Sequence, residues 1–123
     1  MHWLAVGIGG ALGSIARHAV NVTVNRLLGG PVPYATAIVN IVGCFVIGLL
    51  AGLIASTSLR VGDTTRAFVF VGVLGGFTTF SSFGLDTLVL VRGGAVGTAV
   101  ANVAIQVGVG LASVFAGYWV AHR

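Results

Sequence analysis

The sequence predicts an all-α membrane protein with four transmembrane helices in a single domain. Three observations carry this prediction: 57% of the 123 residues are hydrophobic, only 7% are charged, and the mean hydropathy is +1.09. A soluble domain carries roughly 25% charged residues, so this chain cannot cover itself with polar surface. Its 20 glycines are typical of closely packed membrane helices. We therefore expect the lipid bilayer as its solvent and a multi-pass location in the cell (inner or plasma) membrane.

Four apolar segments follow one another along the chain, each long enough to span a bilayer, which takes about 20 residues. The first covers about 3–27 and is ended by the breaker Gly29-Gly30-Pro31-Val32-Pro33. The second covers about 34–56, and a polar loop separates it from the third, about 67–91. A tight turn at Arg92-Gly93-Gly94 leads into the fourth, about 95–120. The loops are too short to fold separately, so we expect one four-helix domain.

The charged residues are six arginines and two aspartates, with no lysine and no glutamate. The sequence pI is near 10.8, but the arginines are dispersed singly, so we expect no nucleic-acid partner. Four spans would place Arg60, Arg66 and Arg123 on one side, and Arg26 and Arg92 on the other. This balance gives no orientation by the positive-inside rule. Either the small count carries no information, or the chain inserts both ways and two copies form an antiparallel dimer.

The third segment is interrupted by the run Gly75-Gly76-Phe77-Thr78-Thr79-Phe80-Ser81-Ser82-Phe83. Paired glycines lose backbone entropy in a helix, and threonine offers its backbone a competing hydrogen bond. We therefore predict that the third helix is broken in the middle of the membrane. Such a break persists at membrane depth only where protein buries it or water lines it. Its freed carbonyls and hydroxyls, flanked by phenylalanines, indicate a permeation or binding site.

Polar residues recur at helical spacing in every segment. They are Ser14, Arg17, Asn21 and Asn25 in the first, Thr36 and Asn40 in the second, Thr79 with Ser81 and Ser82 in the third, and Asn102, Gln106 and Ser113 in the fourth. A single amide or hydroxyl in a membrane helix often only joins two helices. Several such stripes in so apolar a chain favour a polar pathway.

The chemistry of these stripes favours a small anion over a cation. Amides and hydroxyls donate hydrogen bonds, phenyl rings have a positive edge, and the only acids are Asp63 in a loop and Asp86 beyond the break. An arginine within a span, Arg17, adds positive potential and is a functional candidate by default. The alternative, a structural anchor reaching the interface or a carbonyl, stays open for this residue.

Three motifs follow one another along the chain: the early run Gly9-Gly10-Ala11-Leu12-Gly13-Ser14-Ile15-Ala16-Arg17, then Asn40-Ile41-Val42-Gly43-Cys44-Phe45, then the Gly75–Phe83 break. In this order they resemble the Fluc (CrcB) family of fluoride channels, and the resemblance covers essentially the whole chain. It implies a fluoride-selective channel that exports fluoride passively, built as an antiparallel dual-topology dimer with two pores that each use both copies.

The resemblance also implies roles for individual residues. The ring edges of Phe80 and Phe83 would contact fluoride, and Asn40 would donate a hydrogen bond on the pore. Backbone carbonyls of Gly75 and Thr78 from each copy would hold a structural sodium on the dimer axis, since a hard cation prefers oxygen ligands. The family's polar track on the last helix maps to Asn102 and Gln106, where this chain has amides in place of the common hydroxyls. The remaining expected pore residues are Thr79, Ser81 and Ser82, with Arg17 as a structural or electrostatic charge.

Two other classes of membrane protein remain as alternatives. A small dual-topology multidrug antiporter needs a carboxylate in its first span, and no span contains one before Asp86. A membrane scaffold subunit would explain the glycine-rich faces but not the Phe80-Ser81-Ser82-Phe83 run. With no nucleophile–base pair and no metal cluster in the sequence, we do not expect an enzyme. Some family members pair two paralogues; the balanced arginines favour a homodimer, and a paralogue partner remains the alternative.

Overall fold

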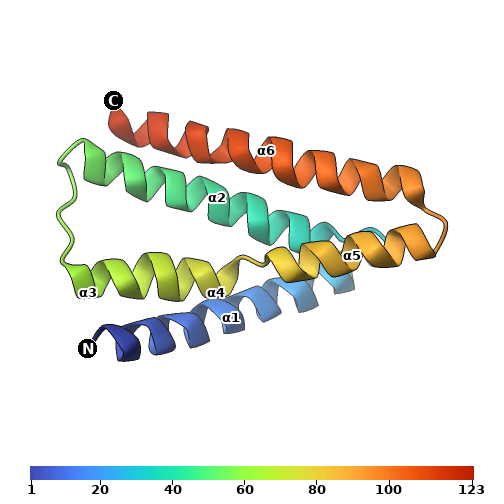
Figure 1. Ribbon diagram of the computed structural model, residues 1–123, viewed down its shortest axis with the longest axis horizontal. Helices are drawn as coiled ribbons and strands as arrows, with labels where there is room; N and C mark the ends of the chain where they lie inside the picture. Colours follow the sequence, from blue (N-terminus) through green and yellow to red (C-terminus); the bar gives the residue numbers. More distant parts are fainter.

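A computed structural model describes all 123 residues as helices joined by short connections, without a β-strand (Figure 1). Three long helices are continuous: α1 (His2–Leu27), α2 (Tyr34–Ala55) and α6 (Val96–His122). The third hydrophobic stretch is divided into α3 (Asp63–Arg66), the π-helix η1 (Ala67–Leu74), α4 (Gly75–Phe77) and α5 (Phe80–Arg92). Both termini lie at the same end of the molecule.

The helices pack as two pairs, with α2 along α6 and α1 along η1 and α4 (Figure 1). Glycines make the α2–α6 contact close, because a side chain at Gly48 or Gly52 would overlap the backbone carbonyl of Val114 or Tyr118. On the other pair, a Cβ at Gly76 would lie 2.6 Å from the carbonyl oxygen of Gly10. Van der Waals contact through small residues is what holds membrane helices together.

Four pairs of glycines lie four residues apart in the sequence: Gly9/Gly13, Gly48/Gly52, Gly72/Gly76 and Gly93/Gly97. The first, second and third pairs all contact a neighbouring helix within the protomer. The fourth pair is different: Gly93 follows the end of α5, and a Cβ at Gly97 would meet nothing within 4 Å. The pairs that pack are Gly9/Gly13, Gly48/Gly52 and Gly72/Gly76.

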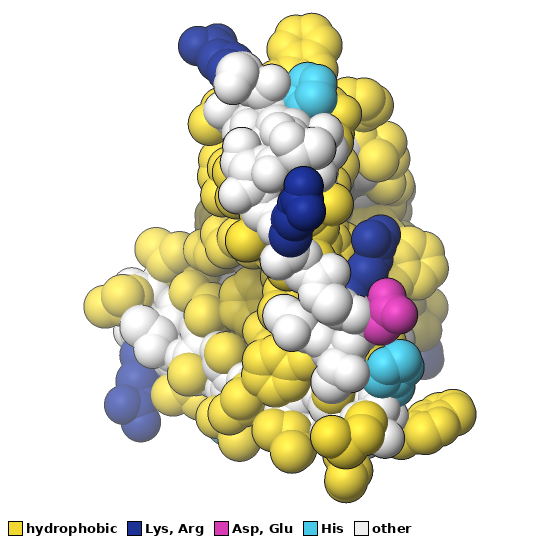
Figure 2. Space-filling model, turned by 90° about the vertical axis from the view of Figure 1, so that its left-hand side faces the viewer, with side chains coloured by type: hydrophobic (Ala, Val, Ile, Leu, Met, Phe, Trp, Pro, Cys, Tyr) yellow, Lys and Arg dark blue, Asp and Glu magenta, His cyan; other side chains and the backbone are white.

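The surface of the protomer is apolar around its sides. Only 17 of 123 residues are buried, and Figure 2 shows hydrophobic side chains along the flanks, with Arg, His and Asp at the end where the termini lie. Three helical stretches are long and apolar enough to cross a membrane: Tyr34–Ala55, Asp63–Arg92 and Val96–His122. Helix α1 has comparable length but carries Arg17, Asn21 and Asn25, and it is not among them.

The break lies slightly beyond the position that the paired glycines predict. Gly75 and Gly76 stay helical, and the backbone becomes extended at Thr78 (ψ 158°) and Thr79 (φ −153°, ψ 113°). Gly76 allows the close approach to α1, whereas Thr79 ends the break as the N-cap of α5 by accepting a hydrogen bond from the N–H of Ser82 at 3.1 Å. The helix begins at Asp63 rather than about residue 67.

Candidate functional site

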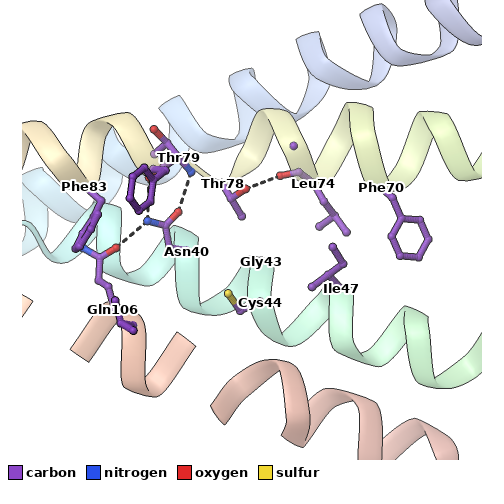
Figure 3. A pocket seen from close by; sticks show the side chains of 13 residues that line it. Asn40, Gly43, Cys44, Ile47, Phe70, Leu74, Thr78, Thr79, Phe83 and Gln106 are labelled. Carbon is purple, nitrogen blue, oxygen red and sulfur yellow. Dashed lines mark hydrogen bonds between the residues drawn. The ribbon is translucent and has the colours of Figure 1, made fainter. Parts of the chain in front are cut away.

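A cavity of about 340 Å³ lies beside the break and is lined by residues from α2, η1, α4, α5 and α6 (Figure 3). Its polar members are Asn40, Thr78, Thr79 and Gln106, and phenyl rings from Phe70, Phe80 and Phe83 complete much of the rest. No acidic side chain lines it. The cavity therefore offers amides, hydroxyls and aromatic rings, the groups from which the sequence predicts an anion pathway.

The side chain of Asn40 on α2 holds the extended backbone of the break. The N–H of Thr79 donates to Oδ1 of Asn40 at 2.8 Å, and Nδ2 of Asn40 donates to the carbonyl of Thr79 at 3.0 Å. Figure 3 shows Asn40 between the break and α6. The break leaves the N–H and C=O of Thr79 without helical partners, and buried backbone groups need partners. One amide thus satisfies both.

From Asn40 a chain of side-chain amides, here called the amide chain, continues into α6 and returns to α5. Asn40 Nδ2 also donates to Gln106 Oε1 at 2.7 Å, and Gln106 Nε2 donates to Asn102 Oδ1 at 2.8 Å. Asn102 Nδ2 donates to Thr87 Oγ1 at 3.1 Å, and that hydroxyl donates to the carbonyl of Phe83 at 2.8 Å. The amide chain consists of Asn40, Gln106 and Asn102, and it links the break to the first turns of α5.

The hydroxyls at the start of α5 form a small cluster around Thr79. Thr79 Oγ1 donates to Ser82 Oγ at 3.0 Å, and it lies 3.4 Å from Ser81 Oγ. Ser81 is exposed and Ser82 is partly exposed, and neither lines the cavity. These hydroxyls therefore cap the helix and flank the cavity rather than forming its wall.

The two phenylalanines of the break lie together in space. The ring centroids of Phe80 and Phe83 are 5.4 Å apart with an interplanar angle of 46°, within the range of favourable aromatic pairs. Both line the cavity. Phe80 is nevertheless 83% exposed in the protomer, a large fraction for a phenyl ring at the centre of a site.

Two backbone carbonyls at the break lose their usual helical donors. In an unbroken helix the N–H of Thr79 would serve the carbonyl of Gly75, and that of Ser82 would serve Thr78. Here Thr79 N–H donates to Asn40 and Ser82 N–H donates to Thr79 Oγ1. Both Gly75 and Thr78 line the cavity. Carbonyl oxygens are ligands that a hard cation accepts, so these residues fit the sodium site that the resemblance implies. No cluster of His, Cys, Asp or Glu side chains offers another metal site.

A second polar contact lies further along α5 and was not predicted. Thr36 Oγ1 donates to Asp86 Oδ2 at 2.7 Å, and Thr36 is 8% exposed. The residues are 50 positions apart, so no local pattern could pair them. Thr87, whose hydroxyl accepts a hydrogen bond from Asn102 of the amide chain, was also not predicted, although it lies one helical turn after Phe83.

The structure brings most of the predicted site residues together. Arg17 is separate: it is partly exposed on α1, one turn beyond Gly13, and makes no salt bridge or hydrogen bond within the protomer. Asn102 lies behind Gln106 and does not line the cavity. The predicted residues that do line it are Asn40, Gly75, Thr78, Thr79, Phe80, Phe83 and Gln106.

The fold and the site together define a small multi-pass membrane protein with a broken helix at its polar centre, a construction that places ion and substrate sites within membranes. The chain matches the family described as CrcB-like protein, Camphor Resistance (CrcB), over residues 4–118. It therefore belongs to the CrcB family, which confirms the resemblance seen in its motifs.

Named relatives are similar over nearly the full length of the chain. It is 48% identical over 114 residues to a protein of Rhodospirillum centenum named fluoride-specific ion channel FluC, covering 93% of this chain and 90% of that protein. Proteins of the same name from Caulobacter vibrioides (44% identical, covering 98% and 94%) and Paracoccus denitrificans (48% identical, covering 94% and 90%) are also similar.

Proposed function

We propose that this chain forms a fluoride-specific ion channel that exports fluoride passively across the cell membrane. The observation that carries this proposal is the pair of phenyl rings, Phe80 and Phe83, beside side-chain amides in a cavity without an acid. The names of the full-length relatives support fluoride as the ion. An ion channel also agrees with the expectation that the chain is not an enzyme.

The chemistry of the cavity suits a small, strongly hydrated anion. Removing water from fluoride is unfavourable unless hydrogen-bond donors and positive ring edges replace it along the path. The break supplies donors and ring edges at a place where an unbroken membrane helix would ordinarily supply none. A narrow passage rich in donors would exclude larger halides, which do not fit it and gain less from the donors.

The working unit of this proposal is an antiparallel dimer of two copies, with α1 as the fourth span of each. Several features support it: α1 is 26 residues long, both termini lie at one end, and the arginines are balanced between the ends. The 83% exposure of Phe80 also supports it, because a second copy would cover that ring and close the pathway. Two pores per dimer, each with residues of both copies, follow from the two-fold symmetry. A paralogue as the second chain is the alternative partner.

A structural sodium at the break belongs to the same proposal. The freed carbonyls of Gly75 and Thr78 would contribute two oxygens from each copy, and a two-fold axis would bring together four. The ion would supply fixed positive charge at the centre of the dimer. This chain's own residues hold the carbonyls in place through Asn40 and the Thr79 cap.

The rival classes have less support in the structure. An antiporter of cationic drugs would need an acid on α1, which has none, and Asp86 on α5 is held by Thr36 outside the cavity. A scaffold subunit would have no need for the phenyl pair or for the amide chain. Neither explains both the break and the amides around it.

The decisive experiment measures fluoride and chloride efflux from liposomes that contain the purified protein. We expect fast loss of fluoride with little loss of chloride, compared with protein-free liposomes. Monodisperse, correctly folded protein that releases neither ion would reject the homodimeric channel. Equal release of both ions would reject fluoride selectivity.

A further inference from the structure

A second cavity, of about 340 Å³, lies at the end of the molecule that carries both termini. The start of α1 forms one part of it, and the stretch from α3 into η1 forms the rest. Its volume falls within the range of small-molecule sites, roughly 300–1,000 Å³. Of its residues only Phe70 also lines the cavity beside the break. The lining residues are His2, Asp63, Arg66, Ala67, Phe70 and Val71.

The lining of this second cavity is polar on one side and apolar on the other. The polar side presents an imidazole, a carboxylate and a guanidinium, all on exposed residues. The apolar side is formed by η1, where Val71 is 61% exposed. Because the third span begins at Asp63, the polar side lies at the membrane surface and the apolar side faces the hydrocarbon. A phospholipid changes from headgroup to acyl chain in the same direction.

The two charges of the cavity are close together but not paired. Asp63 and Arg66 are three residues apart on α3, a spacing that puts Cβ atoms about 5–6 Å apart on a helix, yet no salt bridge joins them. The guanidinium of Arg66 instead lies over the ring of Phe70, with Cζ 5.6 Å from the ring centroid. Figure 2 shows an acidic side chain between a basic side chain and a histidine at the surface of this end. A cation and an anion are therefore both available to a ligand.

We propose that this second cavity binds the headgroup of phosphatidylethanolamine, a zwitterionic phospholipid with a primary ammonium group. The Arg66 guanidinium donates to the phosphate, whose oxygens match its planar fork, and an imidazole N–H of His2 adds a donor. The Asp63 carboxylate accepts from the ammonium, which a short ethylene chain joins to the phosphate. An acyl chain then follows η1 along Val71 into the bilayer.

The chemistry of the cavity distinguishes this headgroup from the two other common ones. A phosphatidylcholine head is also zwitterionic, but its quaternary ammonium has no N–H to donate to Asp63. A phosphatidylglycerol head has a phosphate for Arg66 but no cation for Asp63. The inference does not depend on the proposed channel function, because it concerns a lipid at the membrane surface and not the permeating ion.

The test compares phosphatidylethanolamine, phosphatidylcholine and phosphatidylglycerol with identical acyl chains. Each lipid is added to the purified protein in detergent, native mass spectrometry measures bound lipid, and thermal unfolding measures the rise in melting temperature. We expect the unsubstituted protein to bind phosphatidylethanolamine roughly threefold more tightly than either other lipid. The factor is modest because water weakens charge pairs at exposed residues. Equal binding of the lipids would overturn the inference.

Substitutions of the two charged residues assign the preference to this cavity. Asp63→Asn should abolish the preference for phosphatidylethanolamine, whereas Arg66→Gln should weaken the binding of every lipid. Both residues are exposed, so we expect the melting temperature without lipid to stay unchanged. Arg60→Gln is the matched control, because Arg60 is an exposed arginine of the preceding loop that does not line the cavity. An unchanged lipid preference in Asp63→Asn would overturn the inference.

Soluble glycerophosphoethanolamine separates a lipid site from a site for the headgroup alone. It carries the same phosphate and ammonium groups but has no acyl chain to lie along η1. We expect it to leave the melting temperature unchanged at concentrations at which phosphatidylethanolamine saturates the protein. An equal rise with both compounds would show a site for soluble phosphate esters and overturn the assignment to a lipid. Fluoride efflux tests the proposed channel separately, since these readouts measure lipid binding alone.

Discussion

Asn40 and Thr79 are joined by two reciprocal hydrogen bonds, from Thr79 N–H to Asn40 Oδ1 (2.8 Å) and from Asn40 Nδ2 to Thr79 C=O (3.0 Å). The pairing resembles one rung of an antiparallel ladder, with a side-chain amide in place of the second strand. It can form because Thr79 has extended backbone dihedrals. A single residue on α2 thus stabilises non-helical backbone that the bilayer would otherwise disfavour.

Replacement of Asn40 by leucine of similar size should destabilise the protein. The change leaves the N–H and C=O of Thr79 unpaired, and Thr79 is only 8% exposed. Each buried unpaired group lowers the stability of the folded protein by about 1–3 kcal/mol. We expect a lower melting temperature in detergent by circular dichroism, together with loss of fluoride efflux. The matched control is Asn21→Leu on α1, where the asparagine makes no hydrogen bond within the protomer. An equal melting temperature for Asn40→Leu and the unsubstituted protein would contradict this role.

The phenyl pair should be required for transport but not for folding. Phe80 is 83% exposed in the protomer, so Phe80→Ile removes little packing there, yet it removes the polarised ring edge beside the cavity. We expect Phe80→Ile and Phe83→Ile each to lower fluoride efflux at least tenfold, with monodisperse protein retained. Phe115→Ile on α6, a phenylalanine 64% exposed and outside the cavity, is the control. Full efflux from both variants at the break would contradict a role of the phenyl pair in transport.

The contact between α1 and η1 should tolerate no side chain at Gly13. A Cβ there would overlap the carbonyl of Val73 and approach the backbone N of Phe77 to 2.9 Å. Because backbone cannot move aside like a flexible side chain, we expect Gly13→Ala to cost about 1–3 kcal/mol through overpacking. Gly7→Ala is the control, since nothing lies within 4 Å of a Cβ at that position. Thermal unfolding of both variants makes the comparison, and equal melting temperatures would show that the helices separate easily.

Sodium should stabilise the folded protein, and the stabilisation should grow with the logarithm of the sodium concentration above the Kd. A ligand that binds only the native state adds about 2.7 kcal/mol at roughly 100 times its Kd. We expect the melting temperature to rise with sodium chloride relative to choline chloride at the same ionic strength. Asn40→Leu, which releases the break, should weaken this dependence, whereas Asn21→Leu should keep it. Identical melting temperatures in the two salts would reject a sodium site formed by Gly75 and Thr78.

The helices and the break could be predicted from the sequence because their signals are local. Apolar runs, the Gly29–Pro33 breaker and the Thr78-Thr79 pair all act on neighbouring backbone, and the observed helices begin and end near the predicted residues. The π-helical geometry of η1 gives no such signal, because its residues, Ala67–Leu74, form an ordinary apolar run. The position of the break within its run depends on α1, whose close approach keeps Gly76 helical.

The candidate residues of the site could be predicted, but not their partners. Asn40, Gln106 and Asn102 stand out as amides in apolar helices. Their hydrogen bonds join residues 39 and 66 positions apart, from Asn40 to Thr79 and to Gln106. Such pairings depend on how α2, α5 and α6 pack, and the periodicity of the sequence does not reveal this packing.

The last prediction concerns the two orientations of the chain in the membrane. With Cys44, the only cysteine, replaced by alanine, Ser58→Cys places a label in the exposed loop at the end that carries the termini. We expect an impermeant maleimide added from one side to label about half of the chains, and labelling of all or none would contradict a homodimer of opposed copies.

Added arginines near the ends of spans can fix the orientation of the chain in the membrane. A variant with Ser58→Arg and Thr64→Arg, and another with Leu28→Arg and Pro31→Arg, should therefore insert in opposite senses. Each should lack fluoride efflux when produced alone, because no antiparallel partner would exist. Produced together they should restore efflux, and activity of either variant alone would show that the pathway does not need an inverted copy.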